Sequence, residues 1–408
     1  SYIQNDKYID FELPKLDNIS EDSKSNMPNV YFILPDAMPG PHRIQETYFQ
    51  NYEYESIKEF NNLGFKFINN ASANGVDTYY TVPHMLSMQY FLAKSGKINE
   101  SLHVELKNVF RGINPVVTEF RKRNYKYIYV DGAYGANPCS GMEDICISPN
   151  LMTNNQDRVF LQRTYIPLFF LLLEKRPFTK NILRKLKLSY DNWSLHSESE
   201  DVIFGFEKLE KNLPDISNSP YFYHLHIVLP HHPLRYDEHC NKYPMNEKNP
   251  YEKDFEIWSK GYLDQTKCAE KQILSFVKTI IKHDKNSIIL IHSDTGISHE
   301  ASQEFAVKRI NFSDKTFDNV IGVFAAFKMP SYCYDYINEK EYSSVNAFRI
   351  IFGCIDKRKP DLLSKKIFLV DVDHTKVEGL MERNEQGKWK ISEFNFENRI
   401  NYSIEENK

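Results

Sequence analysis

Short apolar runs and longer segments of helical periodicity alternate along most of the chain. The runs are rich in β-branched and aromatic residues, which is typical of buried strands. We expect strands over residues 30–35, 65–68, 125–130, 221–228, 287–291, 320–327 and 367–372. We expect helices over residues 44–63, 116–123, 158–175, 202–213, 255–281 and 345–351, and another that starts at Thr78 with Pro83 in its first turn. This alternation predicts an α/β fold with a mostly parallel central sheet and helices on both faces.

The same pattern divides the chain into three parts. Residues 1–28 are polar and are interpreted as a disordered arm or linker. Residues 29–355 are expected to form one main domain, and residues 356–408 a small C-terminal subdomain packed on it. The longest apolar run, residues 166–173, is less than half a membrane span and has charged flanks, so it is interpreted as a buried helix. A chain that opens on Ser1 is interpreted as an excised part of a longer protein.

Charge and cysteine content narrow the possible partners and compartments. The net charge of -4 gives no general attraction to nucleic acid or to anionic lipid, so we expect no nucleic-acid partner. Six cysteines are too few for a disulfide scaffold in 408 residues. Cys139 and Cys146 lie in one loop and either close a small ring or are two unrelated thiols. A bridge between them would place the domain outside the cytosol.

Reactive side chains follow three of the expected strands. Asp36, His231 and Asp294 each stand where a strand ends, and the carboxyl ends of parallel strands meet at one edge of a sheet. Each could instead start a turn or cap a helix. Two carboxylates and an imidazole suit a divalent cation, since zinc and manganese accept nitrogen and oxygen whereas magnesium and calcium prefer oxygen.

A hydroxyl and further histidines lie near these strand ends in the sequence. Thr78 is expected to open a helix, where backbone N–H groups and the helix dipole favour an anionic substrate. Coordination to a metal would activate its hydroxyl as a nucleophile, whereas the simpler reading makes Thr78 a helix N-cap. His224 and His226 share one face of a strand and either approach the site or are core histidines. His84 and Ser87 are interpreted as surface or packing residues of the helix.

The order of these segments resembles the sulfatase-like branch of the alkaline phosphatase superfamily. That branch includes sulfatases, lipoteichoic acid synthases, phosphoglycerol transferases and phosphoethanolamine transferases, and the chain most resembles bacterial membrane-anchored proteins with a sulfatase domain. The matching segments are residues 29–36, 78–81, 226, 230–233, 262–265, 288–296 and 344–352. The resemblance implies an alkaline phosphatase-like fold and a sulfatase-like catalytic domain over residues 29–355.

The resemblance also implies roles for single residues. Thr78 takes the place of the nucleophile, and a threonine there excludes the formylglycine chemistry of true sulfatases, which favours phospho-group transfer. The metal-binding positions are Asp36, Thr78, Asp294 and Thr295, and the substrate-binding positions are His231, His226, Thr81 and His292. His231 matches a histidine that lies on either the substrate side or the metal side.

Thr295 departs from the family pattern, which has a histidine at this position. A threonine hydroxyl is a poorer transition-metal ligand than imidazole. The site would therefore bind magnesium, manganese or calcium weakly, recruit His292 or His299, or have lost catalysis.

The resemblance implies metal-dependent transfer or hydrolysis of a phosphoglycerol- or phosphoethanolamine-type ester on a cell-envelope glycan or lipid, through a phospho-threonine intermediate. The ion would be manganese, magnesium or zinc, with calcium as a further option. The alternatives are a sulfatase-like ester hydrolase, or a catalytically silent domain that binds a glycan or a partner, which Thr295 and the 14% aromatic content favour. We expect a monomer on the periplasmic or extracellular face of a bacterial membrane, attached only through a segment outside this chain.

Overall fold

The computed structural model describes the chain in segments. These are residues 27–46, 49, 52–90, 108–110, 112–130, 142–147, 209, 220–232, 234–242, 255–297, 314–370, 377–384, 386 and 388–392. The expected helix over residues 158–175, nearly all of the expected helix over residues 202–213, and the arm up to residue 26 lie outside the described residues.

A seven-stranded sheet runs through the centre of the molecule in the order β2-β7-β6-β1-β5-β3-β4. The five strands from β6 to β4 are parallel, and β7 and β2 form an antiparallel edge. The strands are β1 (Val30–Asp36), β2 (Lys66–Phe67), β3 (Lys126–Val130), β4 (Ile145–Ile147), β5 (Tyr221–Pro230), β6 (Ile288–His292) and β7 (Ala325–Lys328). The predicted mostly parallel α/β sheet is therefore confirmed.

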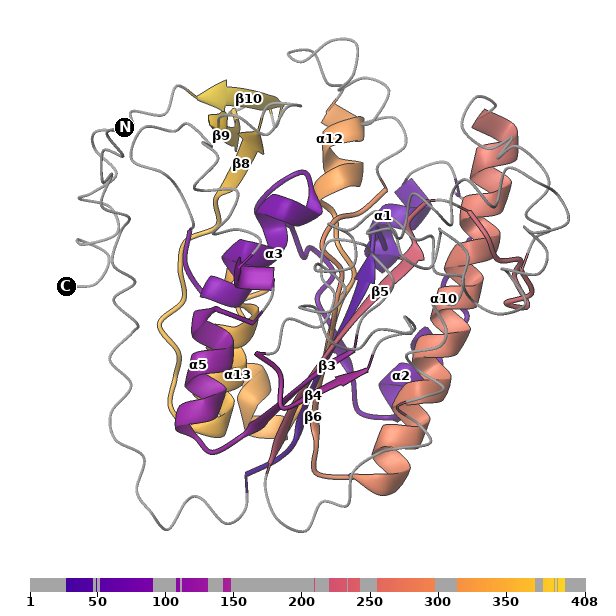
Figure 1. The fold of residues 1–408 in the computed structure, drawn as a ribbon. Helices are drawn as coiled ribbons and strands as arrows, with labels where there is room; N and C mark the ends of the chain where they lie inside the picture. Colours follow the sequence, from indigo (N-terminus) through magenta and orange to yellow (C-terminus); the bar gives the residue numbers. More distant parts are fainter. Residues whose placement is uncertain are drawn as a thin grey trace, which may run out of the picture.

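Helices cover both faces of this sheet, as Figure 1 shows. One face carries α3 (Thr78–Ser87), α5 (Pro115–Lys122) and α13 (Ala347–Ile355), and the other carries α2 (Ile57–Asn62) and α10 (Phe255–His283). Because β1 is buried between these layers, Phe32 and Leu34 pack on the α3 side and Tyr31 and Ile33 on the α10 side. A strand covered on both faces has no polar side to show, which explains its continuous apolar run.

A second, smaller sheet lies beyond the carboxyl end of the central strands (Figure 1). It is antiparallel, in the order β10-β9-β8, with β8 (Ile367–Val370), β9 (Val377–Arg383) and β10 (Trp389–Ser392). It packs on α12 (Asp314–Ile321) through a cluster that includes Phe317, Leu369, Met381 and Trp389. Neither β9 nor β10 was expected from the sequence, because their alternation is weak.

The expected single helix over residues 44–63 is wrong. The segment forms α1 (Pro41–Glu46) and α2 (Ile57–Asn62), and residues 52–54 between them are not helical. Two tyrosines between them turn into the core instead of continuing a helix: the hydroxyl of Tyr52 donates to Glu270 (2.8 Å) and that of Tyr54 to the carbonyl of Pro39 (2.8 Å). Gly64, with φ +87°, follows the C-cap of α2 as expected for a glycine at a helix end.

Two other expectations near the site also differ from the structure. Residues 320–327 do not form one strand, because Val320 and Ile321 complete the amphipathic helix α12 and β7 begins only at Ala325. Pro83 is the sixth residue of α3 and not part of its first turn. His84 and Ser87 are fully buried in the core, so they are packing residues and not surface residues.

Disulfide bonds are more important here than the cysteine count indicated. Cys240 is bridged to Cys268 and Cys333 to Cys354, and Cys146 is also disulfide-bonded, whereas Cys139 lies outside the described residues. Such bridges persist in oxidising compartments, which agrees with a periplasmic or extracellular domain. In the described ranges, no helix has both the length and the apolar character needed to span a membrane.

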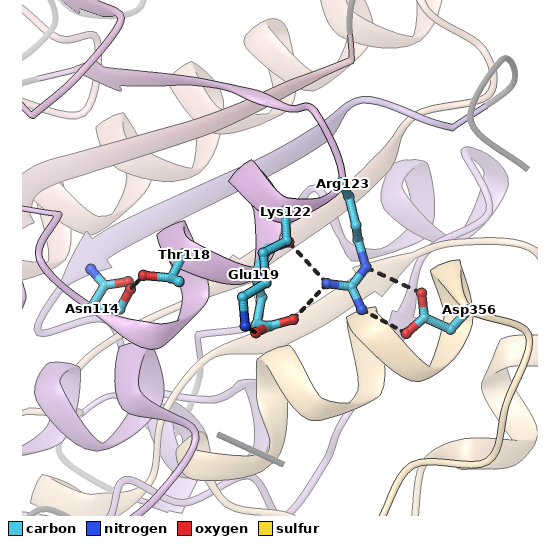
Figure 2. Close-up of polar contacts among 6 residues, drawn as sticks. All are labelled: Asn114, Thr118, Glu119, Lys122, Arg123 and Asp356. Carbon is cyan, nitrogen blue, oxygen red and sulfur yellow. Dashed lines mark hydrogen bonds and ion pairs between the residues drawn. The ribbon is translucent and has the colours of Figure 1, made fainter. Parts of the chain in front are cut away.

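A buried ion-pair network ties α5 to the end of α13 (Figure 2). The guanidinium of Arg123 donates to Glu119 (2.8 Å) and, through two nitrogens, to both carboxylate oxygens of Asp356 (3.2 and 2.8 Å). The side chains of Arg123 and Glu119 are only 1% and 2% exposed. The network lies at the end of the sheet opposite the strand ends that carry Asp36 and Asp294, so it is a structural feature.

Candidate active site

Asp36 ends β1 at the carboxyl edge of the sheet and is fully buried. Neither of its carboxylate oxygens accepts a hydrogen bond from any residue that the structure describes. An unsatisfied buried carboxylate is costly, and almost all buried polar groups in proteins are paired. The environment of Asp36 is therefore suited to a positively charged partner.

Asp294 follows β6 and is bonded to three groups. Its Oδ1 atom accepts hydrogen bonds from the backbone N–H groups of Ala37 (2.9 Å) and Thr295 (2.7 Å), and its Oδ2 atom accepts one from the hydroxyl of Thr78. Since Ala37 follows Asp36 directly, the two aspartates and Thr78 form one connected group. The structure thus joins three of the four expected metal-binding residues, and Thr295 takes part through its backbone.

Thr78 is the first residue of α3, and the helix is capped by Asp77. The Oδ1 atom of Asp77 accepts a hydrogen bond from the N–H of Tyr80 at 2.8 Å, so the N-cap reading applies to Asp77 and not to Thr78. This leaves the Thr78 hydroxyl directed at Asp294, beside the positive end of the helix dipole. A hydroxyl in this position can meet an anionic substrate.

Two of the expected histidines lie beside Asp36. The Nε2 atom of His226 is 3.7 Å from Oδ2 of Asp36, and the side chain of His226 is 4% exposed. His231 is half-buried and follows the cis peptide bond between Leu229 and Pro230, and its backbone N–H donates to the carbonyl of Asp36 at 3.1 Å. Both histidines come from β5 and the loop after it, and β5 pairs with β1.

The carboxyl groups of Asp36 and Asp294 have different pKa values, because burial, mutual repulsion and nearby histidines act on them unequally. Burial first, and then the charge of Asp36, raise the pKa of Asp294 to about 7, against the lowering effect of the Thr78 hydrogen bond. Burial works in the same direction on Asp36, but His231 and His226 outweigh it and hold the pKa of that carboxyl below its ordinary value. Asp36 is therefore ionised at neutral pH, whereas Asp294, which accepts the hydrogen bond of Thr78, has a pKa close to neutral pH.

His224 belongs to the core and not to the site. Burial, and then the nearby His226, lower its pKa to about 3, so the ring is neutral. Its Nδ1 atom lies 3.3 Å from the hydroxyl of Tyr127, and its ring stacks on Phe32. Of the two alternatives for the histidine pair in β5, the core position applies to His224, and the approach to the site applies to His226.

Thr81 and His292 have structural partners of their own. Thr81 is fully buried, and its hydroxyl donates to the carbonyl of Gly75 at 3.3 Å. His292 is also fully buried, its Nδ1 atom lies 2.7 Å from the carbonyl of Ser293, and burial lowers its pKa to about 4. Their substrate-binding roles stay predictions, and His299 lies outside the described residues.

Gly296, the last residue of the Ser-Asp-Thr-Gly segment, is pressed against α12. A Cβ atom added at this position would lie 2.1 Å from the carbonyl oxygen of Asn319 and 2.6 Å from that of Gly322. The N–H of Gly296 donates to the carbonyl of Val320 at 2.7 Å. The loop that carries Asp294 is therefore held directly on the backbone of α12.

Two residues of α10 fix the loops on either side of Asp36, and sequence reasoning assigned them no role. The hydroxyl of Tyr262 donates to the carbonyl of Ala37 (2.6 Å). The side chain of Gln265 donates to the carbonyls of Pro230 (3.0 Å) and His231 (2.7 Å) and accepts from the N–H groups of Arg235 and Tyr236. Residues 262–265 are one of the segments that carry the family resemblance, but the sequence of this segment does not indicate which loop each side chain contacts.

The donor set fits a divalent cation by its chemistry. Among the described residues, no three His, Cys, Asp or Glu side chains are gathered in the manner of a ready metal site. The set instead combines the buried carboxylate of Asp36 with Asp294 and the hydroxyl of Thr78. Carboxylate and hydroxyl oxygens suit magnesium, manganese and calcium, and zinc would draw on a nearby imidazole.

Aspartates at the ends of β1 and β6, a histidine loop after β5 and a threonine at a helix N-terminus lie together at the carboxyl edge of an α/β sheet, in a fold of the alkaline phosphatase-like class. No protein-family model matches the sequence, and no curated protein matches it. Solved structures match by their fold.

The C-terminal periplasmic domain of EcEptC from Escherichia coli aligns over 91% of this chain and 96% of its own length, with 13% identity and a TM-score of 0.50. Ps i-CgsB in complex with k-i-k-neocarrahexaose aligns over 93% of this chain and 90% of its own, with 12% identity and a TM-score of 0.50. At such identities the similarity shows the fold, and it confirms the fold expected from the resemblance.

Two further matches have lower scores. The EcEptC domain in complex with Zn aligns over 82% of this chain and 84% of its own, with 12% identity and a TM-score of 0.46. The integral membrane protein lipooligosaccharide phosphoethanolamine transferase A from Neisseria meningitidis aligns over 83% of this chain, with 13% identity and a TM-score of 0.47. This chain spans only 56% of the length of that transferase.

Proposed function

We propose that the protein is a metal-dependent enzyme that transfers a phosphate ester of the phosphoethanolamine or phosphoglycerol type to a glycan or lipid of the cell envelope. The observation that carries this proposal is the hydrogen bond from the Thr78 hydroxyl to Asp294, beside the carboxylate of Asp36, which accepts no hydrogen bond from the described part of the chain. A nucleophile, a proton acceptor and an anionic cation-binding group are thus joined at the N-terminus of α3.

Asp36, Asp294 and Thr78 would hold the divalent cation, and Thr295 contributes the backbone N–H that fixes Asp294. When bound, the ion would act as a Lewis acid that stabilises charge on the phosphoryl oxygens and lowers the pKa of the attacking hydroxyl. Manganese, magnesium and zinc are the expected ions, and calcium is an alternative. The full burial of Asp36 keeps the electrostatic interactions of the site strong.

The residues of this chain account for the proton movements of a two-step transfer. The Oγ1 atom of Thr78 attacks phosphorus, its proton passes to Oδ2 of Asp294, and the bond from phosphorus to the donor alcohol breaks. His231, which is half-buried, protonates the departing alkoxide. An acceptor hydroxyl then gives its proton to His231 and attacks the phospho-threonine. The bond from phosphorus to the Thr78 oxygen breaks, and that oxygen takes its proton back from Asp294.

Mass spectrometry of the intact protein tests this proposal. After incubation with phosphatidylethanolamine or phosphatidylglycerol and manganese, we expect a covalent phospho-ester adduct that maps to Thr78 by peptide analysis. Thr78→Ala should remove the adduct, whereas Thr279→Ala, which deletes an exposed hydroxyl on α10, should retain it. An unmodified Thr78 under turnover, or turnover that survives Thr78→Ala, contradicts the proposal.

A catalytically silent domain that binds a glycan is the second candidate, and one observation favours it. Position 295 offers the N–H of a threonine where the resemblance implies an imidazole ligand. Under this alternative the protein binds an envelope glycan, forms no adduct on Thr78 and hydrolyses neither phosphodiesters nor sulfate esters. Parallel assays with aryl phosphodiester and aryl sulfate substrates also separate phospho-transfer from sulfate-ester hydrolysis.

A further inference from the structure

The proposed cation site contains oxygen donors from three residues, and the nearest source of nitrogen is not where the family resemblance places it. Position 295 is a threonine, and its backbone N–H donates a hydrogen bond to Oδ1 of Asp294 at 2.7 Å. His292, the other histidine near this loop, directs Nδ1 at the carbonyl of Ser293 and lays its ring beside Tyr342, with ring centroids 5.8 Å apart. The contacts of His292 thus place it in the aromatic core.

The pairing of β5 with β1 brings His226 to the carboxylate of Asp36. Leu34 is the direct partner of His226 in this parallel pair, and the register shifts between Pro35 and Asp36. Side chains two residues apart in a strand share a face, so Leu34 and Asp36 both project on the side where His226 lies. The result is the distance of 3.7 Å between Nε2 of His226 and Oδ2 of Asp36.

This distance suits two ligands of one ion better than it suits a hydrogen bond. A nitrogen and an oxygen that each lie about 2.0–2.2 Å from one ion, at tetrahedral to trigonal angles, are about 3.3–3.8 Å apart. A hydrogen bond between the same atoms would bring them to about 2.7–3.2 Å. Both side chains are buried, at 4% and 1% exposure, so water competes little for either atom.

We propose that Nε2 of His226 is the nitrogen ligand of the divalent cation and takes the part that a histidine at position 295 would play. The ion would then bridge β1, β5 and β6 and join His226 to Asp36, Asp294 and Thr78. This inference rests on the proposed function for the presence of an ion, and it assigns His226 to the metal and leaves His231 to face the substrate.

The consequence for metal choice is that the site prefers zinc or manganese over magnesium and calcium. Imidazole is a good ligand for zinc and a poor one for the two hard ions, whose coordination is dominated by oxygen. The ligand set of one nitrogen with carboxylate and hydroxyl oxygens is of the kind that borderline ions accept.

Titration calorimetry with zinc alone, on the complete chain, tests the assignment without relying on turnover. Loss of a second-shell partner typically lowers metal affinity about 10- to 100-fold, so we expect His226→Ala and His226→Gln to lower zinc affinity by at least about 100-fold. The glutamine variant retains a polar side chain, so it would preserve the affinity if His226 only positioned Asp36. His224→Phe, on the same strand and face, is the matched control and should bind zinc as the wild type does.

A crystal of the wild-type protein soaked in zinc gives a second readout that needs no variant. Anomalous scattering should place the ion about 2.0–2.2 Å from Nε2 of His226 and from oxygens of Asp36 and Asp294. Zinc bound by the carboxylates without His226, or an unchanged affinity in His226→Ala, overturns this inference and leaves the proposed function standing. A wild-type protein that binds no zinc, manganese or magnesium at millimolar concentration overturns both.

Discussion

The hydroxyl of Tyr262, in the N-terminal half of α10, donates a 2.6 Å hydrogen bond to the carbonyl of Ala37, the residue that follows Asp36. Ala37 has a φ of +59°, in the left-handed region that costs a non-glycine residue roughly 1–2 kcal/mol. In this conformation the N–H of Ala37 faces Asp294 while its carbonyl faces Tyr262. One strained residue thus connects the longest helix of the described structure to both carboxylates of the candidate site.

Tyr262→Phe should lower activity more than stability. Loss of the hydroxyl leaves the buried carbonyl of Ala37 without this donor and costs about 1–2 kcal/mol in the free energy of unfolding. Because Ala37 positions Asp294, we expect kcat/KM for a phosphodiester substrate to fall about 10-fold. Urea unfolding and steady-state kinetics on the same preparation measure the two effects. Tyr332→Phe, at an exposed tyrosine far along the chain, should change kinetics little, and an equal loss there would contradict the argument.

Gln265→Leu should loosen the loop that carries His231. The side chain of Gln265 is fully buried and makes four hydrogen bonds to this loop, so its replacement leaves two carbonyls and two N–H groups without their partner. We expect a loss of about 2–4 kcal/mol in the free energy of unfolding. Hydrogen exchange should show faster exchange at Arg235 and Tyr236.

Gln265→Glu provides the matched comparison for that loop. A carboxylate keeps the acceptor for the N–H groups of Arg235 and Tyr236 but loses the donor for the carbonyls of Pro230 and His231. We therefore expect protection at Arg235 to survive while the histidine loop moves. Equal exchange rates in the glutamate and leucine variants would contradict this assignment of donor and acceptor.

Arg123→Met should destabilise the fold without altering the site. The substitution leaves the half-buried carboxylate of Asp356 without Arg123 and the buried carboxylate of Glu119 with Lys122 alone, and breaking a buried pair typically costs about 3–5 kcal/mol. Arg121→Met is the control, because Arg121 is 41% exposed and its pair with Asp144 at 3.7 Å is worth about 0–1 kcal/mol. Thermal unfolding separates the two variants, and zinc affinity of folded Arg123→Met should equal that of the wild type.

Acidification should destabilise the protein through His224. Burial lowers its folded-state pKa to about 3, whereas an exposed imidazole titrates near 6.5. Between these values the unfolded chain binds a proton that the folded protein does not, so the stabilisation is complete above pH 6.5 and is lost as the pH falls. The expected slope from this group is about 1.4 kcal/mol per pH unit.

His224→Phe isolates that contribution, because a phenyl ring can occupy the same stack on Phe32. Urea unfolding between pH 6.5 and 4.5 should show a slope that is smaller by about one proton in the variant. Identical slopes for the variant and the wild type would mean that His224 is protonated in the folded state.

The core strands of the central sheet could be predicted from the sequence, because burial on both faces leaves a continuous apolar run that is hard to mistake. The meeting of Asp36 and Asp294 could also be predicted, since parallel strands deliver their ends to one edge. Thr78 does not end a strand, and its place beside them was expected from the family resemblance. The break between α1 and α2 could not be predicted from the sequence, because it depends on the hydrogen bond from Tyr52 to Glu270, 218 residues later. The same is true of the bridges Cys240–Cys268 and Cys333–Cys354, which depend on packing that no local pattern encodes.

Gly296 sits where any side chain would collide with the backbone of α12, 2.1 Å from the carbonyl oxygen of Asn319. The packing against α12 thus requires a glycine in the Ser-Asp-Thr-Gly segment, independently of any reaction beside Asp294. A relative of this chain that had given up catalysis would still need it, and one that kept catalysis but lost α12 would not. In related sequences, a glycine at this position therefore indicates that the loop packs against a helix. Catalytic activity has to be judged from the residues around the glycine.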